Sequence, residues 1–100
     1  MSRQPLQDQA LAEGLGRVGS WTHDAARGAI SRAFMFTDFT QAFAFMTQVA
    51  LLAERRDHHP EWSNVYNRVR ITWTTHDAKG LTASDIELAG LCDRAYAPRE

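Results

Sequence analysis

Three of the four histidines lie in or shortly after one acidic segment of the sequence. Residues 54–62 carry the adjacent pair His58 and His59 between carboxylates, and His76 and Asp85 follow further along the chain. An imidazole can donate or accept a proton near neutral pH, and a neighbouring carboxylate fixes which ring nitrogen carries the hydrogen. These residue types therefore indicate an active site that transfers protons.

Other roles for the same side chains stay open at the level of the residues. Adjacent histidines at a helix end commonly interact with the negative end of the helix dipole or face solvent. Asp85 also fits a helix-capping position after Thr82, a role that is compatible with support of the site. Glu54 lies one helical turn before His58, so the two would share a helix face if the helix persisted that far. Otherwise Glu54 would pair with a surface arginine.

The N-terminal part of the chain predicts a helix followed by a β-hairpin. Pro5, which suits a first helical turn, and regularly spaced apolar residues predict a short amphipathic helix that ends near Gly14 or Gly16. Residues 21–23 and 29–36 predict the two strands of the hairpin. The helix is expected to cover one surface of the domain.

A long central helix is predicted to follow a cap at Thr37 or Asp38 and to run to about Arg56, because either cap can accept a hydrogen bond from the first turn. Its apolar residues form two neighbouring stripes, more than one sheet requires, and this excess predicts a subunit interface. One stripe comprises Phe39, Phe43, Met46, Ala50 and Ala53, and the other comprises Ala42, Phe45, Val49 and Leu52. Pro60 disfavours a helical conformation at His59, so the paired histidines are expected at the exit of this helix.

The C-terminal half predicts two further strands and a final helix. Residues 62–66 and 69–75 form extended patterns joined at Asn67-Arg68, although one long bent strand fits the same periodicity. Residues 82–85 resemble a capping box, and the apolar spacing after them predicts a helix that ends around residues 96–98. The order helix, two strands, helix, two strands, helix predicts a two-layer α+β domain. We expect a four-stranded antiparallel sheet with the helices packed on one face.

Composition and charge limit the function class. Residues 1–100 are 44% hydrophobic, which suffices for one small domain that would benefit from oligomerisation. The 11 basic and 12 acidic residues give a net charge of -1, so direct binding to nucleic acid is not expected. No apolar stretch suits a membrane span and the polar start does not resemble a signal peptide, so we expect a soluble cytoplasmic protein. Cys92 stands alone, which excludes an intrachain disulfide and favours a packing role.

The same residues carry a resemblance to a known protein family. Residues 39–54, the His-His-Pro-Glu-Trp of 58–62, the Asn-Val-Tyr-Asn of 64–67, Thr75-His76 and Gly80-Leu81 are together similar to the pterin-4a-carbinolamine dehydratase family. That family's pattern places an acidic residue four positions before a His-His-Pro, an aromatic residue after it, another histidine at a strand end and an aspartate beyond. The positions that fit the pattern are Glu54, His58, His59, Pro60, Tyr66, His76 and Asp85.

The resemblance implies removal of water from a 4a-hydroxytetrahydropterin, which an aromatic amino acid hydroxylase forms when it uses the reduced pterin. The product is the quinonoid dihydropterin. Such a dehydration needs an acid for the C4a hydroxyl and a base for the N5 proton, and it implies no metal and no organic cofactor. His58 and His76, both expected at a solvent-accessible site, are the acid and base candidates in an order that stays open. The resemblance implies catalytic roles for His58, His59, His76, Glu54 and Asp85, and substrate binding by His58, His59, Pro60, Thr75, His76, Asp77 and Ala78.

Partners and competing functions follow from the resemblance and from the apolar helix. The family suggests a homotetramer, with a dimer as the other option, and an aromatic amino acid hydroxylase as a further partner. One competing function is a noncatalytic dimerisation or coactivator-type module, because some family members are dimerisation partners of a transcription factor. Another is a metal enzyme, since three imidazoles and a carboxylate can bind zinc or iron. The adjacency of His58 and His59 makes joint coordination of one ion awkward.

Overall fold

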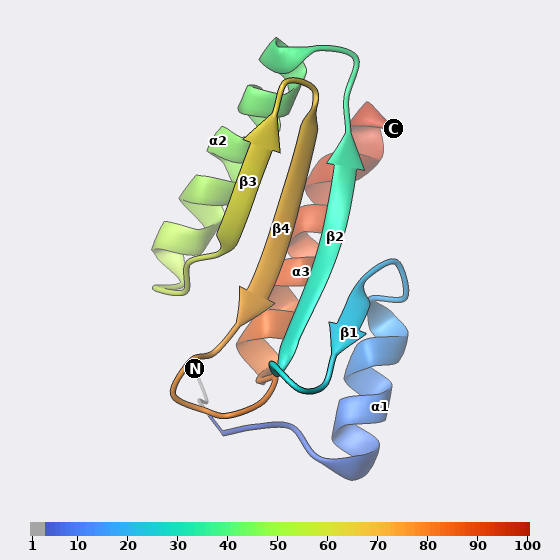
Figure 1. Ribbon diagram of the computed structural model, residues 1–100, viewed down its shortest axis with the longest axis vertical. Coiled ribbons are helices and arrows are strands. Elements are labelled where there is room, and N and C mark those ends of the chain that lie inside the picture. The colour runs from blue at the N-terminus through green and yellow to red at the C-terminus, as the bar shows by residue number, and fades with distance from the viewer. Residues whose placement is uncertain (1–3) are drawn as a thin grey trace.

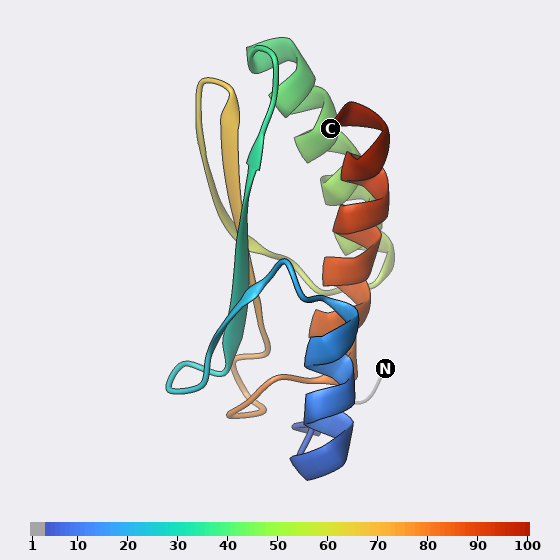
Figure 2. The same ribbon diagram turned by 90° about the vertical axis from the view of Figure 1, so that its right-hand side faces the viewer.

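The computed structural model describes residues 4–100. Helices and β-hairpins alternate along the chain and fold into two layers (Figure 1). The helices are α1 (Asp8–Arg17), α2 (Phe39–Arg55) and α3 (Ala83–Tyr96), followed by a 3₁₀ turn at Ala97–Arg99. The strands are β1 (Thr22–Asp24), β2 (Ala29–Met35), β3 (Glu61–Val65) and β4 (Arg68–Thr74). In a side view these helices lie on one face of the sheet (Figure 2). The predicted α+β class and element order are confirmed.

The strands form one antiparallel sheet in the order β1-β2-β4-β3, so the two hairpins lie side by side. β4 is therefore a central strand with β2 on one side and β3 on the other. Its residues Val69, Ile71 and Trp73 are fully buried under the helices. The end of β4 is consequently held on both sides, which matters because the loop that follows it carries His76.

The β3–β4 hairpin consists of two separate strands, so the alternative of one bent strand is wrong. Its turn lies at residues 66–67, one position earlier than predicted. Val65 pairs with Arg68 and leaves only two residues for the connection. Tyr66 accordingly adopts the left-handed conformation, with φ 51°, that tight hairpin turns use.

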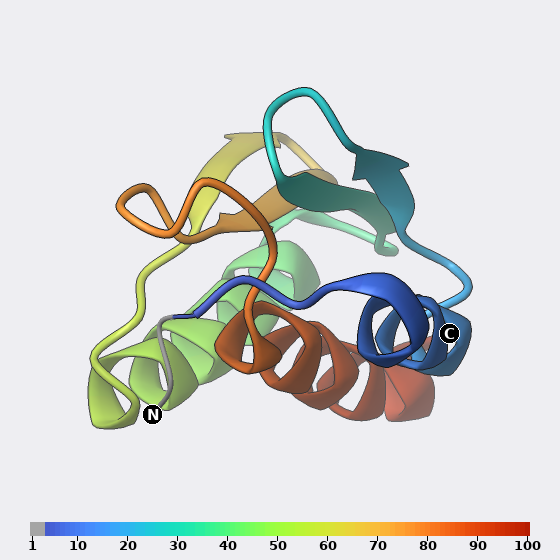
Figure 3. The ribbon, with the colours of Figure 1, turned by 90° about the horizontal axis from the view of Figure 1, so that it is seen from below.

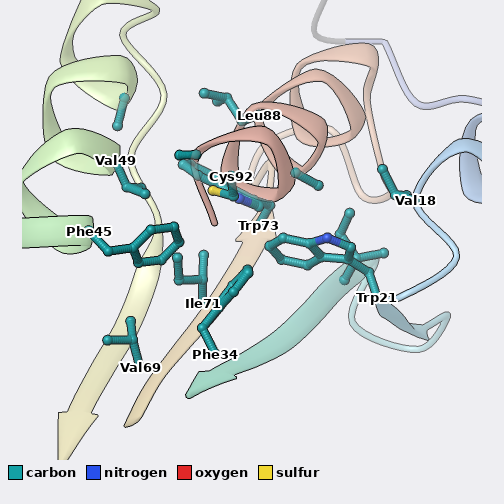
Figure 4. Close-up of a cluster of buried hydrophobic side chains, with 14 of the residues drawn as sticks. Val18, Trp21, Phe34, Phe45, Val49, Val69, Ile71, Trp73, Leu88 and Cys92 are labelled. Atoms are coloured by element: carbon teal, nitrogen blue, oxygen red, sulfur yellow. The ribbon is translucent and has the colours of Figure 1, made fainter. Parts of the chain in front are cut away.

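An aromatic cluster fills the core between the sheet and the helices (Figure 4). The Phe34 ring of β2 meets Trp21 and Tyr96 edge to face, with ring centroids 5.8 and 4.9 Å apart. It also lies 4.9 Å from the Phe45 ring of α2. Leu88 contributes the inner face of α3. These contacts fix α2 and α3 on the sheet, and with them the two helix ends nearest the predicted site.

The first helix differs from its prediction at both ends. Pro5 lies before the helix and not in its first turn, because the Leu6 amide donates to the Leu81 carbonyl at 2.7 Å and holds this segment on the β4–α3 loop. The helix then continues past both predicted end points to Arg17. Gly14 is buried, and a Cβ on it would lie 3.2 Å from Ile86. This glycine therefore permits close helix packing and does not end the helix.

Asp38 caps α2, which settles the choice between the two predicted caps. Its Oδ1 accepts from the Gln41 amide at 2.9 Å. The helix ends at Arg55, and Arg56 is its C-terminal cap. Although α2 has 17 residues, no helix within residues 4–100 is both long and apolar enough to cross a membrane.

The two apolar stripes of α2 face different surroundings. Of the stripe that contains Phe45 and Val49, these two residues and Ala42 are buried in the core, and Leu52 is partly buried. Phe39 and Phe43 of the other stripe are 48% and 56% exposed, and their ring centroids are 5.8 Å apart. Ala53, predicted on this outer stripe, is buried in the core instead. The outer side of α2 thus presents an exposed aromatic pair, which we call the α2 outer face.

We predict that Cys92 is chemically inert in the folded protein. Its side chain is buried in the core (Figure 4), and burial raises the pKa of the thiol from 9.0 to about 12. A thiol-specific reagent at mildly alkaline pH should therefore label Cys92 only after denaturation. Rapid labelling of the native protein would contradict this prediction.

The same buried thiol should make stability depend on pH. The unfolded chain loses the Cys92 proton above about pH 9, whereas the folded chain keeps it up to about pH 12. The folded state then holds the extra proton, so the free energy of unfolding should fall as pH rises through this window, by up to about 1.4 kcal/mol per unit. Denaturant titrations at several pH values should show a shallower slope for Cys92→Ala than for the wild type.

Candidate active site

The loop after α2 and the loop after β4 meet at one end of the molecule (Figure 3). They border an open pocket of about 500 Å³. Its lining residues are Asp57, His58, His59, Pro60, Glu61, Thr74, Thr75, His76 and Asp77. The fold thus brings the three predicted histidines to one pocket from two separate parts of the sequence.

The end of α2 sets the position of the histidine pair. Asp57 adopts a left-handed conformation with φ 50°, and its amide donates to the Glu54 carbonyl at 3.2 Å. The His58 amide donates to the Ala53 carbonyl at 3.1 Å, which completes a Schellman-type helix ending. Pro60 then prevents any continuation of the helix. The paired histidines therefore follow the helix exit, as predicted, and the chain reversal turns His58 inward.

His58 is the buried member of the histidine set. Its Nε2 lies 2.6 Å from Asp85 Oδ1, and the two residues are 8% and 0% exposed. The imidazole also stacks on the Trp73 ring, with centroids 5.8 Å apart and 18° between the planes. The expectation of a solvent-accessible His58 is therefore wrong, because the helix ending directs this side chain to the edge of the core.

Asp85 accepts hydrogen bonds from three segments of the chain. In addition to its contact with His58, its Oδ2 accepts from the Thr75 hydroxyl and from the Thr82 amide, both at 2.9 Å. The Thr82 hydroxyl lies 3.2 Å from the same oxygen and 2.9 Å from the Thr75 hydroxyl. Asp85 thus caps the start of α3 and orients His58 at the same time. The predicted capping role of Asp85 is thus present together with a contact to His58.

His59 and Glu54 form a pair that faces solvent. His59 Nε2 lies 2.8 Å from Glu54 Oε1, and the side chains are 58% and 79% exposed. Glu54 meets His59 and not His58, because α2 ends at Arg55 and the helical i to i+4 spacing stops there. A contact this exposed contributes little to folding stability.

His76 lies on the loop after β4, with 80% of its side chain exposed. Its Nε2 is 3.2 Å from Oε2 of Glu61, and Glu61 Oε1 accepts from Arg27 Nη2 at 2.9 Å. Neither Glu61 nor Arg27 is among the predicted site residues. The position of Glu61 directly after His-His-Pro is a weak sequence signal that this residue belongs to the site. Only the sheet order shows that the start of β3 and the β1–β2 turn lie near the end of β4.

The other predicted residues divide between the pocket wall and its support. The wall includes Pro60, Thr75 and Asp77. Asp85 lies behind His58 and Glu54 lies outside with His59, so neither carboxylate lines the pocket. Ala78 is also outside the lining, and its amide donates to the Thr75 carbonyl at 3.0 Å within the turn.

Each pocket histidine contacts a different carboxylate, and this bears on the metal-enzyme alternative. In the part of the chain that the structure describes, no three His, Cys, Asp or Glu side chains form a cluster suited to a metal ion. Within residues 4–100, the pocket histidines form imidazole–carboxylate pairs. Such pairs suit proton transfer.

Known proteins match this chain over most of its length. A protein of Rhizorhabdus wittichii, provisionally named a pterin-4-alpha-carbinolamine dehydratase, is 57% identical over 89 residues, or 89% of this chain and 92% of the relative. A Mesorhizobium japonicum protein of the same provisional name is 51% identical over 89 residues, or 89% and 91% of the two chains. The crystal structure of a Brucella melitensis protein, named a transcriptional coactivator/pterin dehydratase, has a TM-score of 0.86 and 43% identity. The match covers 92% of this chain and 98% of the Brucella melitensis chain.

The family comparison agrees with the motif residues gathered at the pocket. The family model described as pterin 4 alpha carbinolamine dehydratase matches residues 4–95. The named activity is the removal of water, which makes the chain an enzyme of the hydro-lyase class. From the pocket motifs, the shared fold and these matches it follows that the chain belongs to the pterin-4a-carbinolamine dehydratase family.

Proposed function

We propose that this chain dehydrates a 4a-hydroxytetrahydropterin to the quinonoid dihydropterin by histidine acid/base catalysis. The observation that carries the proposal is one pocket that receives His58 and His59 from the exit of α2 and His76 from the loop after β4. Its volume of about 500 Å³ suits a bicyclic heterocycle. Membership of the dehydratase family supports the same substrate class.

The reaction needs two coordinated proton transfers. One group protonates the C4a hydroxyl while the C4a–O bond breaks and water leaves. A second group removes the N5 proton while the C4a=N5 double bond forms. The elimination involves no net oxidation, so the proposal includes no redox step, and it assigns the proton transfers to imidazoles without a metal or an organic cofactor. Protonated and neutral imidazoles can supply both groups near neutral pH.

We assign the two transfers to His58 and His76, in either order. Asp85 and Trp73 hold His58 in a fixed position, whereas His76 reaches the pocket from an exposed loop. The proposed pterin contacts are His59, Pro60 and the backbone of residues 75–78. Glu54 and Asp85 act as the partners of the imidazoles and not as direct proton donors.

The proposed reaction follows that of an aromatic amino acid hydroxylase, because such an enzyme leaves the pterin in its 4a-hydroxylated form. Dehydration is the first step that returns the pterin toward its reduced form. We place this cycle in the cytoplasm and propose the hydroxylase as the functional partner of this chain.

The α2 outer face supports an oligomer of this chain. Phe39 and Phe43 are exposed there side by side, and burial of apolar surface contributes about 25 cal/mol per Å². We propose that a second copy covers this face, as a dimer or as part of a tetramer. The same face favours a coactivator-type binding role as the second candidate function, and the name of the Brucella melitensis protein joins both activities.

Loss of either principal histidine should remove most of the turnover. We predict that His58→Ala and His76→Ala lower kcat/KM at least about 100-fold, because each removes one proton-transfer group. His76→Ala should fold like the wild type, whereas His58→Ala should also lose stability because Asp85 keeps an unpaired buried charge. The rate is measured by stopped flow with freshly generated 4a-hydroxytetrahydropterin. His23→Ala on β1, outside the pocket lining, is the control, and near-wild-type turnover in both pocket variants would reject the assignment.

Asp85→Asn should damage both catalysis and folding. An amide has one accepting oxygen, so it cannot accept from His58 and from the threonine donors together. We expect the free energy of unfolding to fall by about 3 kcal/mol and kcat by at least about 100-fold, measured where the variant is fully folded. Asp93→Asn, the same change on α3 with Trp21 and Arg32 as partners, should lose stability and keep kcat. Wild-type kcat in Asp85→Asn would contradict the proposed role.

Phe43→Glu should weaken the proposed assembly, because it places a charge in the α2 outer face. Sedimentation measured over a range of protein concentrations should show a shift toward the monomer. Met35→Glu, at an exposed apolar position on β2, is the matched control and should leave the assembly unchanged. A monomeric wild type would show that the α2 outer face does not bind a second copy.

A further inference from the structure

We propose that Glu61 is a positioning residue for His76, and that Arg27 holds Glu61 in the orientation that this role requires. The inference rests on the proposed function, in which His76 exchanges a proton with the pterin. Three segments contribute: the β1–β2 turn, the start of β3 and the loop after β4. Arg27 Nη2 donates to Glu61 Oε1 at 2.9 Å, and Glu61 Oε2 lies 3.2 Å from His76 Nε2.

His76 needs such a partner because little else orients its ring. The side chain is mostly exposed, and Glu61 provides a polar contact at its Nε2. An exposed imidazole otherwise samples several rotamers and both tautomers, which reduces the time it spends in a reactive geometry. Glu61 is suited to restrain it because its backbone is paired with Thr72 of the central strand β4. A group on a rigid strand can therefore orient a side chain on a loop.

The contact also selects one nitrogen of the ring. The Glu61 oxygen makes an ion-pair contact with Nε2 at 3.2 Å, and a carboxylate beside a ring nitrogen favours the tautomer with its hydrogen on that nitrogen, which would leave Nδ1 for the substrate. His58 and His59 follow the same rule, with Nε2 at 2.6 Å from Asp85 and at 2.8 Å from Glu54. All three pocket histidines thus have a carboxylate oxygen close to Nε2.

Arg27 extends from a turn that is itself fixed against the loop bearing His76. Gly28 adopts a left-handed conformation with φ 62°, and a Cβ on it would lie 2.7 Å from Gly80 Cα, so the two backbones are in direct contact. The Gly28 carbonyl also accepts from the Thr74 hydroxyl at 3.0 Å. The Arg27 guanidinium occupies one oxygen of Glu61 and leaves the other oxygen for His76.

The expected effect of this network is kinetic. The side chains of Arg27 and Glu61 are 53% and 42% exposed, and ion pairs of this kind contribute little to folding stability. Removal of Glu61 should therefore leave the unfolding transition close to that of the wild type. What should change is the fraction of molecules in which His76 is oriented for proton transfer.

The first test is a double-mutant cycle with Glu61→Gln and His76→Ala. We expect Glu61→Gln to lower kcat about 10-fold with little change in KM, because the oriented fraction of His76 falls. In the His76→Ala background the same substitution should have no further effect, since Glu61 acts through His76. Additive losses would overturn the inference, because Glu61 would then act on the pterin directly. Wild-type kcat in Glu61→Gln would also overturn it.

The second test does not depend on turnover. Nitrogen-15 chemical shifts of the histidine rings, assigned with His76→Ala, report which nitrogen of His76 carries the hydrogen. We expect the Nε2–H form in the wild type at mildly alkaline pH, and a mixture of tautomers in Glu61→Gln. Arg27→Ala should show a smaller change in the same direction, and Arg27→Lys should lie closer to the wild type. An identical tautomer ratio in wild type and Glu61→Gln would overturn the inference.

Glu87→Gln is the matched control. It removes the partly exposed carboxylate that pairs with Arg56 outside the pocket lining, and it should change neither kcat nor the ring shifts of His76. The two readouts also separate this inference from the proposed function. A wild type that fails to dehydrate the pterin but shows the expected ring shifts would reject the reaction and support the positioning role.

Discussion

The rest of the site depends on the hydrogen bonds made by the buried Asp85 carboxylate. Its oxygens accept hydrogen bonds from His58 after α2, from Thr75 after β4 and from Thr82 before α3. A buried carboxylate that lost its partners would destabilise the fold by several kcal/mol. These hydrogen bonds therefore join the three segments at one buried side chain. The contacts that join these segments therefore also fix the position of His58.

The fold holds His58 more firmly than the other two pocket histidines. His58 is buried, hydrogen-bonded and stacked on Trp73, whereas His59 and His76 are exposed and paired with carboxylates near the surface. This difference fits an elimination. Under the proposed reaction, the fixed group would define where the heterocycle binds, and the exposed groups would lie where the leaving water escapes to solvent. The open shape of the pocket is consistent with such a path.

Local signals in the sequence predict the order of helices and strands and the place of the histidines, because apolar spacing and caps encode them. The partners of the histidines depend on chain reversals and on sheet order, which no local pattern reports. The i to i+4 spacing of a helix predicts a contact between Glu54 and His58. Because the chain reverses at the end of α2, Glu54 contacts His59 instead. Glu61 reaches His76 only because β3 and β4 are neighbours in the sheet.

The contact between Gly28 and Gly80 joins the β1–β2 turn to the loop after β4, which borders the pocket. A side chain at Gly28 would collide with the Gly80 backbone, and a Cβ at Gly80 would come within 3.1 Å of Pro5. Consider a chimera with the β1–β2 turn of one relative and the loop after β4 of another. A mismatch at this contact would displace both segments. Transplants designed to alter substrate preference should move these loops together, as one exchangeable unit.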